Sequence, residues 1–341
     1  MRALSYHRTG DPDVLTITDR EVVPPGPGQV QVRVARSGVN PTDWKTRRGS
    51  GDGGPAPFPV TVPNQDGAGT ITAVGQGVDA ARVGERVWLY EAAFKRAEGT
   101  AQELTVVPAT QAVALPEDAS FDLGASLGIP FLTAHRALSV HEEGPDQLGP
   151  GSLAGRTVLV AGGAGAVGNA AIQLARWSDA TVITTVSSPQ KAQLAAAAGS
   201  DHVIDYRRQD VVELVKAIVP HGVDVIVEVA AGPNAAIDAA VLARNGVVAC
   251  YADDGAAQVS LPVRELMVPN ARWQFVLVYT EPHEAKRRAV EAVSTALAQR
   301  MLRVGAPAGL PLHHYPLAEG ARAHAAVEAG AAGKVLIDVA G

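Results

Sequence analysis

The chain has 341 residues, of which 47% are hydrophobic and 19% are charged, and its formal net charge is −6. This length predicts about two domains, and the acidic balance leaves no basic field for binding nucleic acid or an anionic membrane surface. We expect no signal peptide and no membrane span, because no apolar run is long enough, and the single cysteine, Cys250, favours a reducing, cytoplasmic setting.

Residues 1 to about 125 are predicted to form short strands separated by turns. Val30, Val32 and Val34 alternate with less apolar residues, which is typical of a half-buried strand, and a Pro- and Gly-rich cluster precedes them. A Gly- and Pro-rich surface loop is expected over 49–59. Further short strands are expected within 63–75, 83–89 and 99–108. Their glycine-separated spacing predicts a small irregular barrel.

From Ser126 onward the pattern changes to alternating strands and helices. A helix is expected at Pro130–Leu138, followed by an exposed connector over 141–155. Strands are expected at 158–160, 181–186, 202–204, 223–230, 246–251 and 275–279, and helices at 190–198, 210–219, 234–243 and 283–302. This alternation predicts a doubly wound parallel sheet with a ligand at the carboxyl ends of its strands. A last strand is expected within 333–339.

A glycine pattern lies where the first of these strands turns directly into a helix. Gly162, Gly165 and Gly168 follow the apolar strand at the spacing G-x-x-G-x-x-G, and a helical apolar stripe comes after them. Bare backbone at such a turn lets a pyrophosphate approach the free N–H groups of the first helical turn. The predicted dinucleotide-binding residues are Gly162, Gly163, Ala164, Gly165, Ala166, Val167 and Gly168.

Several further stretches make the chain resemble a known family. They are GVNPTDWKTRRG (38–49), PNQDGAGTITAVG (63–75), ASLGIPFLTAHRAL (125–138), VLVAGGAGAVGNAAIQLA (158–175), PLAEGARAHAAVEAG (316–330) and GKVLIDV (333–339). In this order they resemble the zinc-free quinone oxidoreductase (zeta-crystallin-like) family of medium-chain dehydrogenases/reductases. The resemblance implies an α/β protein with a GroES-like β-barrel domain, 1–129 and 282–341, and a Rossmann dinucleotide-binding domain, 130–281.

The residues at the zinc positions of related alcohol dehydrogenases are not zinc ligands here. Asn40 stands where those relatives carry Cys, and Gln65 and Asp66 stand where they carry His and Glu. A catalytic zinc needs three Cys, His or carboxylate ligands, and a neutral amide is a poor substitute. We therefore predict no metal site.

The cofactor choice is predicted from the residues after the second and third strands. The second strand ends in Ser187 and Ser188 without the acidic residue that favours NAD, and Lys191 follows one helical turn later. Hydroxyls and cations suit a 2′-phosphate, and the resemblance assigns this phosphate to Lys191 and Tyr206. NADPH is therefore the expected cofactor. The alternative for the neighbouring Arg207 and Arg208 is a solvated surface position.

The resemblance also implies contacts elsewhere with the cofactor. The residues implied are Asn40, Asp43, Thr133, Ala230, Tyr251, Val278 and Lys334. The alternatives are a turn cap for Asp43, a cap or a packing role for Thr133, and packing for Tyr251.

A proton donor is the least defined part of the prediction. Many family members have a tyrosine a few residues after an Arg-x-Gly, but here Gly49 is followed by Ser, Gly, Asp and Gly. Asp43 and His135 are the nearest candidates. A quinone can accept hydride and then take a proton from water, so it demands less of a positioned acid than an enoyl thioester does. We therefore expect hydride transfer to a quinone or an α,β-unsaturated carbonyl. The alternatives are an enone or enoyl reductase of a biosynthetic pathway and a non-catalytic NADPH-binding sensor.

The sixth strand of the predicted sheet has the sequence FVLVY (275–279) and is apolar along its whole length. An exposed apolar strand at the edge of a sheet tends to pair with a strand of another chain unless it is covered. In the resembling family two subunits join at this strand, so a homodimer formed by isologous pairing is expected.

Overall fold

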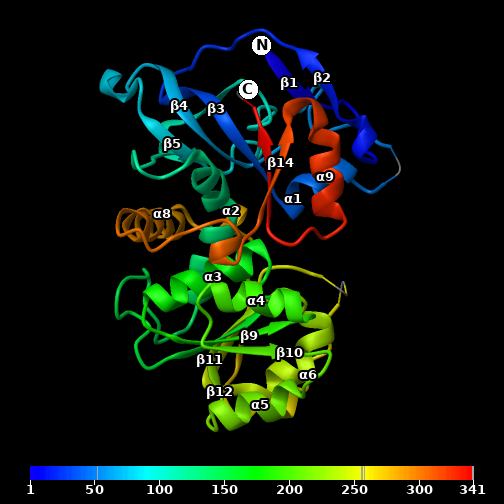
Figure 1. Cartoon of the computed structure of the whole chain (residues 1–341), viewed down its shortest axis with the longest axis vertical. Coiled ribbons are helices and arrows are strands. Elements are labelled where there is room, and N and C mark those ends of the chain that lie inside the picture. Colours follow the sequence, from blue (N-terminus) through cyan, green and yellow to red (C-terminus); the bar gives the residue numbers. More distant parts are fainter. Residues whose placement is uncertain (52, 255, 257, 340–341) are drawn as a thin grey trace. The chain divides into compact units, whose positions relative to one another are not determined.

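The computed structural model describes residues 1–51, 53–254, 256 and 258–339, and it divides the chain into two compact units (Figure 1). The first unit comprises Met1–Ile129 and Leu312–Gly341, and the second comprises Pro130–Pro311. Asp52, in the loop expected over 49–59, lies outside the described residues. No helix in the described part of the chain is long and apolar enough to cross a membrane.

The first unit is built around one mostly antiparallel sheet. Its strand order is β14-β15-β3-β4-β5-β7, β6 also pairs with β3, and β1 pairs with β2 separately. The pairing is antiparallel except between β14 and β15. The strands are β1 (Arg2–Ser5), β2 (Thr16–Asp19), β3 (Gln29–Val39), β4 (Asp66–Val74), β5 (Arg86–Leu89), β6 (Leu104–Pro108), β7 (Ala112–Ala114), β14 (Leu312–Pro316) and β15 (Lys334–Asp338).

The long strand β3 confirms the alternation predicted from its sequence. Val30, Val32 and Val34 are completely buried, whereas Arg33 is exposed. Gln31 is also buried, and its amide is satisfied on both sides. Its Nε2 donates to the Val23 carbonyl over 2.8 Å and its Oε1 accepts from Thr72 Oγ1 over 2.9 Å. Burial of this amide is therefore offset by hydrogen bonds.

Two helices of the first unit, α1 and α9, contact each other and cover part of a core that includes Leu4, Tyr6 and Ile337. The helical elements of this unit are η1 (Pro12–Val14), α1 (Pro41–Arg48), η2 (Ala80–Arg82), η3 (Ala109–Gln111), η6 (Leu317–Glu319) and α9 (Gly320–Glu328). Helix α1 begins directly after β3 ends, which places the residues of this turn against the start of β4.

Helix α2 (Phe121–Leu138) begins nine residues before the predicted start at Pro130. It is kinked at Gly128, whose φ of −31° and ψ of −106° are not helical. A Cβ at Gly128 would lie 2.1 Å from Asp66 Oδ1. The kink precedes Pro130, which cannot donate to a helical hydrogen bond. The proline therefore marks a break within the helix rather than its first turn.

The second unit confirms the predicted doubly wound sheet. Its strands are parallel and follow the order β10-β9-β8-β11-β12-β13. Figure 1 shows α3 and α4 on one face of this sheet and α5 and α6 on the other. The elements are β8 (Thr157–Ala161), α3 (Ala166–Trp177), β9 (Thr181–Val186), α4 (Pro189–Ala197), β10 (His202–Asp205), α5 (Val211–Ile218), β11 (Val223–Glu228), α6 (Ala231–Val241), β12 (Leu242–Cys250), α7 (Val263–Met267), β13 (Arg272–Phe275), η4 (Val278–Thr280), α8 (His283–Ala298) and η5 (Ala306–Ala308).

The sixth strand differs from the prediction of a strand at 275–279. β13 covers Arg272–Phe275 and pairs with Val247–Cys250 of β12. The Val276 N–H still donates to the Cys250 carbonyl over 2.8 Å, but β12 ends at Cys250, so in the described structure the ladder stops there. Val276 and Val278 are buried instead, and the chain turns into η4. The apolar run therefore marks buried positions at Val276, Val278 and Tyr279 only, while Phe275 and Leu277 stay exposed.

The return of the chain to the first unit also differs from the expected boundary at 282. Helix α8 and the segment after it belong to the second unit because they bond to α3. Trp177 Nε1 donates to Gln299 Oε1 over 2.7 Å, and Asn169 Nδ2 donates to the Ala308 carbonyl over 2.8 Å. The chain therefore re-enters the first unit at Leu312.

Candidate functional site

The turn between β8 and α3 requires glycine at three of its positions. Gly162 has a φ of +71°, which is unfavourable for a residue with a side chain. A Cβ at Gly163 would lie 2.1 Å from Thr184 Oγ1, and a Cβ at Gly168 would lie 2.4 Å from the Gly162 carbonyl oxygen. The absence of side chains at these positions lets the end of the strand pack closely against the first turn of the helix, as the predicted dinucleotide turn demands.

The same turn leaves backbone donors available for an anion. The first hydrogen bond of α3 runs from the Asn169 N–H to the Gly165 carbonyl over 2.8 Å. The N–H groups of Ala166, Val167 and Gly168 therefore have no acceptor within the helix. Ala164 is buried beside them. The positive end of the helix dipole adds to these donors, so the turn fits a pyrophosphate.

The residues predicted to bind the 2′-phosphate lie at neighbouring positions of the sheet edge. Ser187 follows β9, Tyr206 follows β10, and these two strands pair. The Tyr206 N–H donates to the Val186 carbonyl over 3.1 Å, and its side chain is 51% exposed. Ser188 Oγ caps α4 by accepting the Lys191 N–H over 3.3 Å. The cap places Lys191 in the first turn of α4.

Arg207 and Arg208 follow Tyr206, and both positions contact Asp205. The Arg207 N–H donates to Asp205 Oδ1 over 3.1 Å, and Arg208 Nε lies 3.8 Å from Asp205 Oδ2 with its side chain 71% exposed. An ion pair this exposed contributes little. The geometry of Arg208 thus matches the solvated-surface alternative.

Ala230 and Tyr251 lie together at the ends of β11 and β12. Ala230 is the N-cap of α6, and the Tyr251 N–H donates to the Glu228 carbonyl over 3.0 Å. Val278 lies in η4, beyond the end of β13, and not at a strand terminus as expected. Glu228 was not among the predicted site residues, although an acidic residue directly after the apolar run over 225–227 was a visible signal.

Thr133 and His135 lie in the part of α2 that belongs to the second unit, and both are buried. His135 Nε2 accepts the Leu148 N–H over 3.2 Å and so anchors the connector after α2. Burial, together with the charge of Arg136, lowers the pKa of His135 to about 4. A histidine that is neutral at pH 7 and accepts a backbone proton does not fit the predicted role of proton donor.

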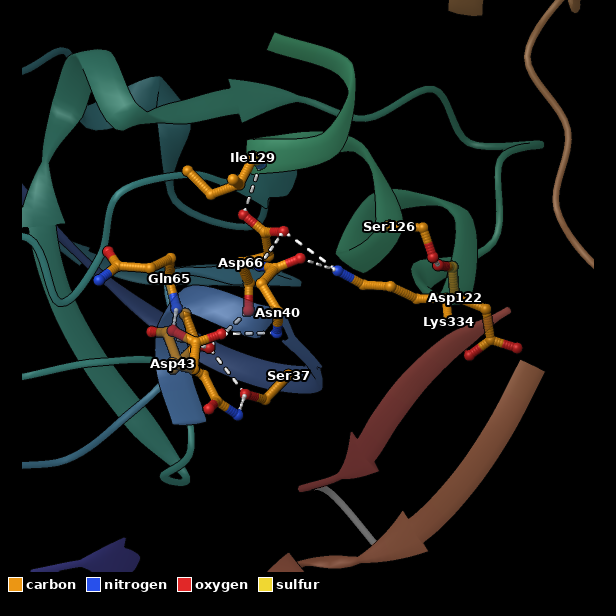
Figure 2. Close-up of polar contacts among 11 residues, drawn as sticks. Ser37, Asn40, Asp43, Gln65, Asp66, Asp122, Ser126, Ile129 and Lys334 are labelled. Carbon is orange, nitrogen blue, oxygen red and sulfur yellow. Dashed lines mark hydrogen bonds and ion pairs between the residues drawn. The ribbon is translucent and has the colours of Figure 1, made fainter. Parts of the chain in front are cut away.

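A buried polar cluster joins α1, β4 and β15 in the first unit (Figure 2). Lys334 Nζ donates to Asn40 Oδ1 over 2.7 Å and lies 3.2 Å from Asp66 Oδ2. Asn40 Nδ2 donates to the same carboxylate oxygen over 2.7 Å, and the Ile129 N–H donates to Asp66 Oδ1 over 2.8 Å. All three side chains are at most 2% exposed. The Asn40 amide is therefore held in one orientation.

Asp43 closes the turn into α1. Its carboxylate accepts the Asn40 N–H over 2.7 Å and the Gln65 N–H over 3.2 Å (Figure 2). The first of these bonds is a helix cap, as one alternative for this residue proposed. Burial, with the Asp66 charge adding to it, raises the pKa of Asp43 to about 8 despite these two N–H donors. Asp43 thus ties the turn before α1 to the segment before β4.

The donor set around Asn40 does not resemble a zinc site. Asn40 is engaged with Lys334 and Asp66, and Gln65 Oε1 accepts the Ala93 N–H over 3.1 Å. Within the described residues there is no group of three or more His, Cys, Asp or Glu side chains that could hold a metal ion.

The supporting hydrogen bonds of this cluster include residues that were not predicted. His324 Nε2 lies 2.9 Å from Asn64 Oδ1, Asn64 Nδ2 donates to Ser37 Oγ over 2.9 Å, and Ser37 Oγ lies 2.7 Å from Thr100 Oγ1. Thr100 Oγ1 then donates to the Asp66 carbonyl over 2.5 Å. This chain of contacts fixes the backbone on both sides of Gln65, and the spacing of these residues in the sequence gave no signal for it.

Comparison with known proteins agrees with both units. The family model described as "Alcohol dehydrogenase GroES-like domain" matches residues 26–117, and the one described as "Zinc-binding dehydrogenase" matches residues 166–295. The quinone oxidoreductase of Lama guanicoe is 30% identical over 99% of this chain and 97% of its own length. The synaptic vesicle membrane protein VAT-1 homolog of Rattus norvegicus is 34% identical over 84% of this chain and 68% of its own length.

A solved structure with the same fold is that of the Escherichia coli quinone oxidoreductase complexed with NADPH. It superposes with a TM-score of 0.81 at 25% identity and covers 99% of this chain and 100% of its own. These similarities confirm the expected combination of a GroES-like domain and a Rossmann-type parallel sheet.

Proposed function

Because the chain belongs to the quinone oxidoreductase family of medium-chain dehydrogenases/reductases, we propose that it transfers hydride from NADPH to a quinone or a related electron-poor carbonyl. The observation that carries this proposal is the turn from β8 to α3, where glycines let the strand end pack closely on the helix and the N–H groups of Ala166, Val167 and Gly168 have no acceptor within the helix. The relatives supply the reaction class, since a fold alone does not determine a function.

NADPH fits the residues at the edge of the second unit. The turn at Gly162–Gly168 would hold the pyrophosphate, and Ser187, Lys191 and Tyr206 would hold the 2′-phosphate, since no carboxylate closes β9 to repel it. When bound, the cofactor supplies a hydride from C4 of its nicotinamide. Asn40, Thr133, Ala230, Tyr251, Val278 and Lys334 complete the proposed set of cofactor residues.

We propose that the reaction does not use zinc. Asn40 and Gln65 are weak zinc ligands, and their amide oxygens already accept hydrogen bonds. A quinone is an electron-poor acceptor whose charge spreads over its ring and oxygens as hydride arrives. One proton from water then completes the hydroquinone, so no positioned acid is needed. Asp43 shapes the turn in this proposal, and His135 takes no part in proton transfer.

The test is the oxidation of NADPH by the purified protein, followed by absorbance in a stopped-flow instrument. We expect simple quinones to oxidise bound NADPH faster than enones or enoyl thioesters do. Faster reaction with enones or enoyl thioesters would indicate a biosynthetic reductase instead. Tight NADPH binding without oxidation by any acceptor would indicate a sensor and would contradict the proposed activity.

The cofactor preference has its own test. We expect NADPH to bind at least about tenfold more tightly than NADH, because a charged hydrogen bond to the 2′-phosphate is worth about 1.5–3 kcal/mol. Lys191→Ala should weaken NADPH binding and leave NADH binding nearly unchanged, as measured by fluorescence titration. Equal affinity of the unaltered protein for both cofactors would contradict this assignment.

Two further parts of the proposal concern the protein in the cell. We propose a homodimer formed at the edge of the second unit's sheet, because β13 ends the strand order and exposed apolar residues, Phe275 and Leu277, lie at and just beyond its end. We also propose a cytoplasmic location, where Cys250 stays a free, buried thiol. Cell fractionation, with the protein detected in each fraction by an antibody, tests the location.

A further inference from the structure

Two buried carboxyl groups lie behind the turn that leads from β11 into α6. Glu228 is the last residue of β11 and is completely buried, and Asp238 lies on α6 with 1% of its surface exposed. A carboxylate placed in such surroundings is costly unless it is hydrogen-bonded or paired with a cation. The hydrogen-bond partners of these two groups therefore determine whether each is charged or protonated.

The Glu228 carboxylate holds the turn at Ala230. It accepts the backbone N–H of Ala230, and Asn234 Nδ2 donates to its two oxygens over 3.1 and 3.2 Å. The Glu228 backbone carbonyl accepts the Tyr251 N–H as well. One acidic residue thus fixes Ala230 and Tyr251, which are both proposed to contact the cofactor.

Asp238 has a different set of partners. Asp238 follows Asn234 by one turn of α6 and lines the same cavity as Asn234 and Glu228, and among the described residues no donor reaches its buried Oδ2 atom. Two carboxylates cannot hydrogen-bond to each other without a proton between them. One proton on Asp238 supplies the missing donor and removes one of the two negative charges. Burial, followed by the Glu228 charge, raises the pKa of Asp238 to about 9.

The described residues around this cavity include no cation that could replace this proton. A cavity of about 330 Å³ adjoins the pair, and among the described residues that line it none is Lys, Arg or His. Its other titratable neighbours are Tyr206 and Asp210, on the β10 and α5 side. From the end of β12, Cys250 and Tyr251 face Glu228, whose charge raises the pKa of both after burial. Each of these groups is neutral or negative, so none of them would balance the negative charge of a second carboxylate.

We propose that Glu228 and Asp238 share one proton and act as a positioning pair for the part of the cofactor site formed by Ala230. With the proton in place, the pair holds Ala230 at the start of α6. When the proton is lost in alkaline solution, repulsion between the two carboxylates moves Glu228 away from Ala230 and NADPH binding weakens. The effect on NADPH rests on the function proposed above, whereas the shared proton does not.

The test measures NADPH dissociation constants between about pH 7 and about pH 10. If the pair titrates near pH 9, about one tenth of the protein is competent at pH 10, and the constant should rise about tenfold. Asp238→Asn keeps a donor toward Glu228 at every pH, and Glu228→Gln keeps an acceptor for Ala230 while donating to Asp238. Both variants should lose this rise. Glu213→Gln, an exposed change on neighbouring α5, should keep it.

A second measurement, made without cofactor, separates the proton from the function. The infrared difference spectrum between the unaltered protein and Asp238→Asn should contain a protonated-carboxyl band near neutral pH that disappears in alkali. Absence of this band would overturn the shared proton, whatever NADPH does. If the band is present but the NADPH dissociation constant does not change with pH, the positioning role is overturned. Its presence in a protein that binds no NADPH would support the pair and contradict the proposed function instead.

Discussion

Lys334 illustrates how a single side chain can hold the first unit's site together. Its ammonium group is 1% exposed and contacts both Asn40 and Asp66. Forming a buried ion pair gains little net stability, but removing one partner leaves the other charged and unsolvated. The Asp66 carboxylate would then keep only the Asn40 amide and one backbone N–H as donors.

We therefore expect Lys334→Met to destabilise the protein by about 3–5 kcal/mol, because Asp66 becomes an uncompensated buried charge. The free energy of unfolding in urea measures this loss. The double variant Lys334→Met, Asp66→Asn should be more stable than Lys334→Met alone, because the lone charge is gone. If Lys334→Met lowers the free energy of unfolding by less than about 1 kcal/mol, Lys334 is not needed to neutralise the buried charge of Asp66.

A second residue-level prediction concerns Asp43 and pH. Burial raises its pKa to about 8 in the folded protein, and an unfolded aspartate titrates near about 3.9. Between these values the folded state binds one proton more than the unfolded state. The stability that Asp43 contributes is therefore complete below about pH 4 and is lost as pH rises through about 8.

Relative to Asp43→Asn, the unaltered protein should lose up to about 1.4 kcal/mol of unfolding free energy per pH unit across this window. Urea unfolding of both proteins at several pH values measures the difference, and other titrating groups cancel because both proteins contain them. If the unaltered protein instead gains unfolding free energy relative to Asp43→Asn as pH rises, Asp43 is ionised in the folded protein and its pKa is lowered.

Residues could be predicted from the sequence where the backbone or the family pattern constrains them. The residues Asn40, Asp43 and Lys334 come together as one cluster, and the glycines form a turn that needs them. Asp238 could not be found in this way, because a single acid in an alanine-rich helix is usually exposed. Its burial depends on the register between α6 and the end of β11, which is a tertiary property.

At the scale of elements, the second unit followed its sequence closely where neighbouring strands agree. Strand β9 covers the predicted 181–186, and β8 is buried along its whole length. Predictions differed from the structure where pairing ends or the helix is broken, at β13 and at Gly128 in α2. A hydrophobic pattern reports burial, but strand ends depend on the partner strand and helix starts depend on capping.

The turn between β8 and α3 gives an element-level prediction. In Gly168→Ala the new Cβ meets the Gly162 carbonyl oxygen at 2.4 Å, so strand and helix must separate and the N–H groups lose their arrangement. We expect NADPH binding to weaken by at least about tenfold in a fluorescence titration. The matched control is Gly149→Ala, since a Cβ there meets nothing within 4 Å. Equal binding by both variants would show that the turn does not hold the cofactor.

At the scale of the whole molecule, the sheet of the second unit ends in an apolar surface. β13 pairs with β12 on one side only. Phe275 is 63% exposed and Leu277 is 56% exposed, and the nearby segment over 263–268 adds Val263, Met267 and Val268, each more than 60% exposed. An uncovered edge with large apolar side chains favours pairing with a second copy of the same strand.

We expect the protein to sediment as a dimer at micromolar concentration and the double variant Phe275→Asp, Leu277→Arg to sediment as a monomer. The variant places charges where an isologous interface would bury them, and burying unpaired charges is costly. Val22→Asp, at a position 52% exposed in the first unit, is the control and should remain dimeric. A monomeric unaltered protein would refute the dimer. A dimeric double variant would move the interface away from β13, and the exposed residues there would then need another partner.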